Sequence, residues 1–309
     1  MCLMLVEVLG SAAGGGFPQW NCNCVQCAAV REGSPRFKAR TQSSIAVSQD
    51  GAHWLLINAS PDIRQQLTNS RHLHPVSGPR HTPLIGVVLT DAQIDHVTGL
   101  LMLREGCPLD LFCTPSVYGE LTETFPVLSV LEHWNGGFRF HPILEDLSGT
   151  IAPSAFSTLQ LKPIPLVSNA PPYSPRRNRP KPGDNIGLYI EDTQTGKGLF
   201  YAPGLAEITQ DIQTCLKRAD CVLVDGTFWS NDEMSKVGLG QKLARDMGHL
   251  PLSGTAGMIE ALEFWAPQAR KILIHINNTN PILDEQSPER ALLTAKQIEV
   301  AYDGMQIRI

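Results

Sequence analysis

One short stretch decides the fold: V-V-L-T-D-A-Q-I-D-H, residues 87–96. Its apolar start predicts a buried strand, and a helix is expected over residues 97–104. The loop between them holds Asp91, Asp95 and His96, and carboxylates with imidazoles are common metal ligands, so the loop is a candidate metal site in an α/β protein. The alternative is a turn in which Asp95 caps the following helix. This stretch alone leaves both open.

Composition narrows the class of protein. The chain has 309 residues, is 42% hydrophobic and 18% charged, and carries a formal net charge of -5. We expect neither nucleic acid nor an anionic membrane as a partner, because no basic surplus is present. No apolar run approaches the roughly 20 residues of a membrane span. The start of the chain is apolar but has Glu7 and no basic leader, so we expect a first strand, no secretion signal and a cytoplasmic location.

Three of the eight cysteines lie together at Cys22, Cys24 and Cys27. Thiolates at these spacings can converge on one tetrahedral ion. Such clustering suits a metal better than a disulfide framework. We therefore predict a structural Zn²⁺ held by these cysteines. No second cysteine pair follows, so the fourth ligand is open between a histidine, an amide and water.

Two further polar residues follow apolar runs in the second half of the chain. Asp225 follows residues 221–224, and His275 follows residues 271–274. Like the loop at residues 90–96, these two residues lie just after the C-terminal ends of predicted strands. That edge, the rim of the sheet, is where α/β folds bind ligands. So many ligand types on one rim predict a metal centre. For Asp225 the alternative is a turn cap, and for His249, which precedes a predicted helix, it is a core histidine.

Two loops are candidates for binding. Residues 10–16 are rich in glycine, which lets backbone approach a ligand closely, but they lack the dinucleotide fingerprint. Residues 170–184 form a proline- and arginine-rich run, and such a run in a compact domain is a functional lid or disordered. Tyr173, Arg176 and Arg177 either clamp an acidic substrate there or face solvent. The sequence leaves both open.

The remaining elements follow from periodicity and turn residues. We predict helices over residues 206–218, 254–264 and 288–297. Strands are predicted over residues 3–9, 41–47, 54–58, 109–113, 186–190, 198–202 and 298–301, with further strand structure over 143–166.

The chain resembles the metallo-β-lactamase superfamily, an αββα sandwich in which T-H-x-H-x-D-H follows an internal strand. The same slot reads T-D-A-Q-I-D-H here. Longer blocks resemble one member, the PqqB family of pyrroloquinoline quinone (PQQ) biosynthesis: G-S-A-A-G-G-G-F-P-Q-W-N-C-N-C, N-A-S-P-D-I-R, D-N-I-G-L, D-G-T-F-W and H-I-N-N-T-N-P-I-L, between residues 10 and 283. The resemblance implies one metallo-β-lactamase-like domain over residues 1–309, with a zinc loop at 21–27 and a Pro/Arg-rich loop at 170–184.

Departures from the hydrolase pattern suggest different chemistry. Asp91 and Gln93 replace two motif histidines, P-L-V-S at residues 165–168 lacks a third, and Y-A-P-G at 201–204 lacks the bridging carboxylate. One half of a dinuclear site has therefore lost most of its ligands, which disfavours a two-zinc hydrolase. What remains is two imidazoles and one carboxylate, the ligand set of non-haem iron(II) oxygenases.

The resemblance implies O2-using, iron-dependent hydroxylation of the tyrosine ring in a peptide-derived Glu–Tyr cross-linked precursor of PQQ. On this reading Asp95, His96 and His275 hold Fe²⁺. Asp91 is a further ligand or a proton acceptor. Asp225 and His249 support the site or transfer protons.

The cysteine centre would then be structural, with Asn278 or water as its fourth partner. The main alternative function is a carrier that assists transport of PQQ or its precursor to the periplasm without chemistry. Its glycine-rich loop and the Arg176-Arg177 pair would hold a carboxylated quinone. The sequence leaves the oligomeric state open, with a homodimer as one option.

Overall fold

Two β-sheets form the centre of the computed structural model, which describes residues 4–144 and 146–309. The first sheet contains, in spatial order, β13 (Met305–Arg308), β1 (Leu5–Gly10), β2 (Ser44–Ser48), β3 (Trp54–Ile57), β4 (Leu84–Val88), β5 (Leu109–Cys113) and β6 (Phe138–Pro142). The second contains β12 (Ile298–Val300), β11 (Arg270–Ile274), β10 (Cys221–Asp225), β9 (Lys197–Ala202), β8 (Ile186–Asp192) and β7 (Leu159–Pro165).

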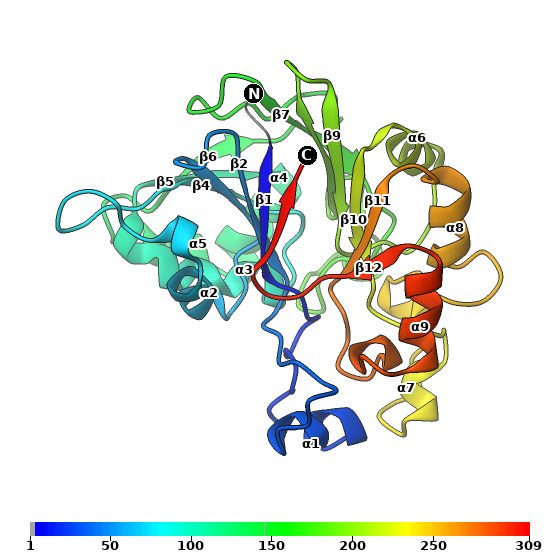
Figure 1. Cartoon of the computed structure of the whole chain (residues 1–309). Coiled ribbons are helices and arrows are strands. Elements are labelled where there is room, and N and C mark those ends of the chain that lie inside the picture. The colour runs from blue at the N-terminus through cyan, green and yellow to red at the C-terminus, as the bar shows by residue number, and fades with distance from the viewer. Residues whose placement is uncertain (1–3, 145) are drawn as a thin grey trace.

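Helices cover the outer faces of the two sheets (Figure 1). The helices of the described residues are α1 (Val25–Arg31), α2 (Ile63–Asn69), α3 (Ile94–Val97), α4 (Pro115–Gly119), α5 (Val127–Leu131), α6 (Gln210–Arg218), α7 (Glu233–Lys236), α8 (Met258–Trp265) and α9 (Pro288–Ala295), and not all of them lie on a sheet face. Helix α9 begins where expected, because the Ser287 side chain caps it ahead of Pro288. None of the helices in the described ranges has the length and apolar character that a membrane span requires.

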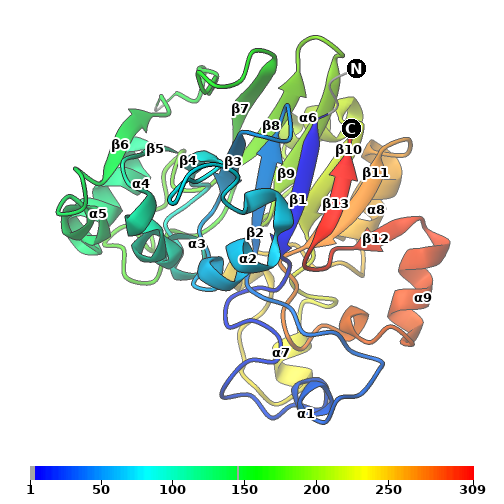
Figure 2. The ribbon, with the colours of Figure 1, turned by 60° about the vertical axis from the view of Figure 1, so that its left-hand side comes forward.

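One core lies between the sheets and joins side chains of both, such as Leu55 and Val88 of the first and Leu223 and Ile274 of the second. Helices α2, α4 and α5 pack on the outside of the first sheet, and α6, α8 and α9 pack on the outside of the second. The layers are therefore α, β, β and α, which confirms the predicted metallo-β-lactamase-like fold class. Figure 2 shows α1 and α7 together at the end of the molecule away from the chain termini.

Most predicted strands are confirmed to within a few residues, and two predictions are wrong. Of the strand structure expected over 143–166, the described residues form a strand at Leu159–Pro165 and a single bridge at Ile151, because Gly149 and Pro153 interrupt the earlier part of that run. The helix expected over 97–104 is mostly a 3₁₀ helix at Thr98–Gly106, after the short helix α3.

Candidate metal centre

Three strand ends carry the candidate residues to one edge of the sandwich. Asp91 lies just after β4, Asp225 is the last residue of β10, and His275 follows β11 directly. Strands β10 and β11 are parallel neighbours, so their carboxyl ends meet on the same side of the second sheet. Helix α3 brings Asp95 and His96 from the first sheet to the same place.

Asp95, His96 and His275 form the first group, with ligand atoms within 4.8 Å of one another. His275 Nε2 lies 3.2 Å from Asp95 Oδ2. The rings of His96 and His275 meet edge to face, with centroids 5.4 Å apart. Within the described residues, His96 Nε2 is buried and has no hydrogen-bond partner. A buried imidazole nitrogen without a partner is costly, so this group fits a bound cation.

Asp91 contacts the other nitrogen of His96. Its Oδ2 and Oδ1 lie 2.8 Å and 2.9 Å from His96 Nδ1, and it accepts a hydrogen bond from the Gln93 backbone at 2.9 Å. A carboxylate on Nδ1 fixes the ring and turns Nε2 toward Asp95 and His275. Burial opposes charge on the ring, but Asp91 and Asp95 raise the pKa of His96 to about 9.

A second carboxylate–histidine pair lies beside His275. His249 Nδ1 is 2.7 Å from Asp225 Oδ2, and the rings of His249 and His275 stack with centroids 5.4 Å apart. These three residues form another group whose ligand atoms lie within 4.8 Å of one another. Burial opposes charge on His249, but the fully buried Asp225 carboxylate raises its pKa.

Thr227 connects the members of this second group. Its hydroxyl lies 2.6 Å from Asp225 Oδ1, 2.9 Å from His275 Nδ1 and 3.1 Å from His249 Nδ1. The sequence reasoning did not single out this residue. The signal was available, since a hydroxyl two residues after a strand-end aspartate can bond to that aspartate.

Cys22, Cys24 and Cys27 form a third group, with their sulfur atoms within 4.8 Å of one another. Cys22 and Cys27 are buried, and Cys24 is partly exposed. Asn278 Nδ2 lies 3.2, 3.7 and 3.3 Å from the three sulfurs. Three converging sulfurs fit the ligand set of a zinc site, and the Asn278 amide stands beside them as a candidate fourth partner.

Two loops border the first group. A Cβ atom added to Gly14 would lie 3.1 Å from Asp95 Oδ2, so a larger side chain would crowd that carboxylate. From the loop at 170–184, the Tyr173 hydroxyl donates a hydrogen bond to the Ala92 carbonyl, and its ring packs against Phe125. The glycine-rich loop and Tyr173 therefore both lie next to the metal-site loop.

The two arginines of the same loop are held by protein groups. The Arg176 guanidinium lies 3.0 Å from both the Glu120 and the Asp184 carboxylates, which are buried. Arg177 donates a hydrogen bond to the Ala170 carbonyl. Arg176 thus anchors the loop through two ion pairs that already balance its charge.

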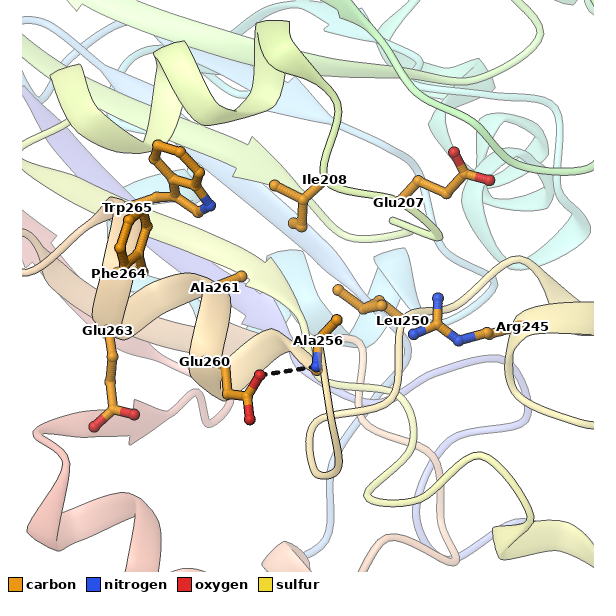
Figure 3. A pocket seen from close by; sticks show the side chains of 11 residues that line it. Glu207, Ile208, Arg245, Leu250, Ala256, Glu260, Ala261, Glu263, Phe264 and Trp265 are labelled. Carbon is orange, nitrogen blue, oxygen red and sulfur yellow. Dashed lines mark hydrogen bonds between the residues drawn. The ribbon is translucent and has the colours of Figure 1, made fainter.

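A cavity of about 710 Å³ lies beside α8. Figure 3 shows Phe264 and Trp265 at one end and Arg245 at the other. Leu250, which follows His249, lines it, but the residues of the three groups do not. The cavity therefore borders the His249 segment without being part of the metal centre.

Comparison with known proteins identifies the family. A model of the beta-lactamase superfamily domain matches residues 53–276. Coenzyme PQQ synthesis protein B of Pseudomonas savastanoi pv. phaseolicola is 55% identical over 306 residues, which cover 99% of this chain and 100% of the relative. The protein of the same name from Azotobacter vinelandii is 56% identical over 304 residues, which cover 98% and 99%.

A solved structure supports the same assignment. The Zn²⁺-bound PqqB from Methylobacterium extorquens superposes with a TM-score of 0.89 at 38% identity, covering 99% of this chain and 100% of that one. The family resemblance expected from the sequence blocks is confirmed. The chain belongs to the coenzyme PQQ synthesis protein B (PqqB) family, within the metallo-β-lactamase superfamily.

Proposed function

We propose that this chain acts in PQQ biosynthesis as an iron-dependent hydroxylase that uses O2 to hydroxylate the tyrosine ring of a Glu–Tyr cross-linked precursor. Membership of the PqqB family supports the pathway. The reaction type rests on one observation, the group of two imidazoles and one carboxylate in which His96 Nε2 is buried without a partner among the described residues. That ligand set, with open positions, is the one used by non-haem iron(II) oxygenases.

In this proposal Asp95, His96 and His275 hold Fe²⁺, which when bound would supply the activation of O2 for transfer of one oxygen atom to the ring. The other oxygen atom would leave as water, with two electrons from an added small-molecule reductant and two protons. Asp91 keeps His96 Nε2 turned toward the ion by holding Nδ1. Cys22, Cys24 and Cys27 hold a structural Zn²⁺; the Zn²⁺-bound relative from Methylobacterium extorquens supports zinc binding in the family.

Asp225 and His249 handle protons. The contact between Asp225 Oδ2 and His249 Nδ1 keeps a proton on Nδ1, so Nε2 is the ring atom that can accept the phenol proton of the substrate. The His249 side chain is 16% exposed, against 3% for His96. It is therefore the more accessible of the two to a substrate in the centre.

The loop that contains Tyr173, Arg176 and Arg177 borders the substrate side of the site. Tyr173 borders the metal loop through its contact with Ala92, which suits a role in positioning the substrate. Because Arg176 is paired with Glu120 and Asp184, we assign it to holding the loop in place. Because these carboxylates balance its charge, Arg176 is not free to bind a carboxylated quinone. The carrier function is therefore kept only as an outcome of the test.

The test is reconstitution of the metal-free chain with Fe²⁺ without O2, followed by exposure to O2 in the presence of a tyrosine-containing cross-linked dipeptide and of ascorbate as the two-electron reductant. Mass spectrometry of the dipeptide should show the gain of one oxygen atom. The gain should disappear in His96→Ala and His275→Ala and persist in the matched surface variant His141→Ala, whose side chain is 46% exposed. An iron-loaded chain that binds PQQ tightly and leaves the dipeptide unchanged would favour the carrier.

A further inference from the structure

The backbone of His275 is held in an uncommon conformation. Its φ angle is +59°, in the left-handed region that residues other than glycine rarely adopt. Such a conformation persists only where the surroundings hold it. The position of this proposed ligand therefore depends on what anchors the residues that follow it.

The segment of residues 276–280 is anchored to two neighbouring loops. Ile276 exchanges backbone hydrogen bonds with the glycine-rich loop, donating to Ser11 O at 3.0 Å and accepting from Ala13 N at 2.9 Å. The Asn280 side chain donates to Gly226 O at 2.9 Å, next to the Asp225 strand end. Within the segment, Asn277 N donates to Thr227 O at 3.1 Å and the Thr279 hydroxyl donates to the buried Glu233 carboxylate at 2.5 Å, so Asn278 is the residue of the segment whose side chain reaches the cysteine group.

Asn278 joins this segment to the cysteine group. It is 5% exposed, and its Nδ2 faces all three sulfurs. Among the described residues, it is the one side chain outside the group with hydrogen bonds to these sulfurs. Only two residues separate it from His275, so the cysteine centre and the active centre share one short, buried segment.

Filling the cysteine centre has to change this contact. An N–H group donates to thiolates but cannot ligate a cation, so a bound ion requires the Asn278 amide to turn its oxygen inward or to move away. Either response changes the restraint on the segment. If the ion and the amide together order the segment, less conformational entropy is lost when the active centre then binds its own metal.

We infer that Asn278 is a positioning residue that couples the two centres, so that an occupied cysteine centre tightens metal binding at Asp95, His96 and His275. The inference rests on the two metal centres of the proposed function and concerns affinity, not turnover. Coupling free energies between sites in proteins typically correspond to roughly 5–150-fold, and we expect about tenfold here because the linking segment is short.

The experiment measures Mn²⁺ affinity of the full metal-free chain by the electron paramagnetic resonance of free Mn²⁺, before and after addition of one equivalent of Zn²⁺. Mn²⁺ suits carboxylate and imidazole ligands and not thiolates, so it reports the active centre. Protection of Cys22, Cys24 and Cys27 from alkylation, mapped by mass, verifies where Zn²⁺ has bound. Zn²⁺ should tighten Mn²⁺ binding about tenfold, and Mn²⁺ should tighten Zn²⁺ binding by the same factor.

In Asn278→Ala, the Mn²⁺ affinity should be the same with and without Zn²⁺. Asn277→Ala is the matched control, since the Asn277 amide bonds to Thr279 and not to the cysteines, and it should keep the coupling. An equal Mn²⁺ affinity of the unsubstituted chain with and without Zn²⁺ would overturn the inference, and so would coupling that survives in Asn278→Ala. The comparison of the unsubstituted chain with and without Zn²⁺ does not depend on whether any variant folds. Because neither readout involves product formation, failure here is distinct from failure of the hydroxylase proposal.

Discussion

Two carboxylate–histidine pairs meet at the candidate metal centre and differ in their surroundings. Asp91 holds His96 at the edge of the first sheet, and Asp225 holds His249 at the edge of the second. In the first pair the histidine is deeply buried, and a further carboxylate, Asp95, lies beside it. In the second pair a hydroxyl contacts both members, and the histidine is more open to solvent although its aspartate is fully buried. A carboxylate and an imidazole can therefore serve two purposes: cation binding in the first pair and proton transfer in the second.

The largest effect is expected from His96→Ala. This change removes the ligand with the buried, unpartnered nitrogen, so the active centre should lose its metal and all turnover. The loss should exceed the roughly 10–100-fold that follows from losing a ligand's hydrogen-bond partner. Metal analysis after Fe²⁺ loading and dialysis measures it. His249→Ala is the control and should keep the iron. Equal loss of iron in both variants would contradict the assignment of cation binding to the first pair alone.

Asp225→Asn should separate rate from binding. The amide cannot hold His249 as a proton acceptor, so turnover should fall by about 10²–10⁴-fold, the usual contribution of general acid–base catalysis. Metal content should remain that of the unsubstituted chain. Single-turnover kinetics with metal analysis of the same sample makes the comparison. Loss of iron in this variant would mean that the second pair is also a ligand set.

Asp91→Asn should weaken metal binding and leave the ligands in place. Loss of the carboxylate that orients His96 should cost about 10–100-fold in Fe²⁺ affinity, as for other partners of metal ligands. Anaerobic calorimetry measures the affinity. Turnover at saturating Fe²⁺ should be largely retained, and an unchanged affinity would remove Asp91 from the metal-binding pair.

The first pair also predicts a pH dependence. The pKa of His96 is raised to about 9, so below that pH the ring carries a proton that a metal ion must displace. Fe²⁺ or Mn²⁺ affinity should rise by about tenfold per pH unit as pH increases and level off near pH 9. In Asp91→Asn the rise should end at a lower pH, because one of the two charges that raise the pKa of His96 is gone and only that of Asp95 remains. Calorimetry across pH tests this, and a flat profile would contradict it.

The sequence was informative where a residue directly follows an apolar strand. Asp225 and His275 could be placed on one rim because the carboxyl ends of parallel strands meet at one edge, and Asp91 was expected there because it also follows an apolar strand. The fold class followed from the same pattern of strands and from the family resemblance. The sulfur group could be placed because Cys22 and Cys27 are close in the chain.

Contacts between distant segments could not be predicted in the same way. That Asp91 binds Nδ1 of His96 depends on the turn conformation of the metal loop, which spacing does not specify. Arg176 suggested a free cation because one partner, Glu120, is far away in the chain and the other, Asp184, faces it only through the turn conformation of the loop. Thr227 gains its place from the packing of three segments, and hydroxyl residues are too common to indicate such contacts on their own.

We propose that this centre transfers oxygen from O2 to the tyrosine ring. The most direct measurement is a single turnover of the Fe²⁺-loaded chain with the cross-linked dipeptide and ascorbate, under isotopically labelled O2 in unlabelled water, read by mass. We expect one labelled oxygen atom in the product, and none in His96→Ala. A product whose added oxygen comes from water, or an unchanged dipeptide from fully loaded protein, would contradict it.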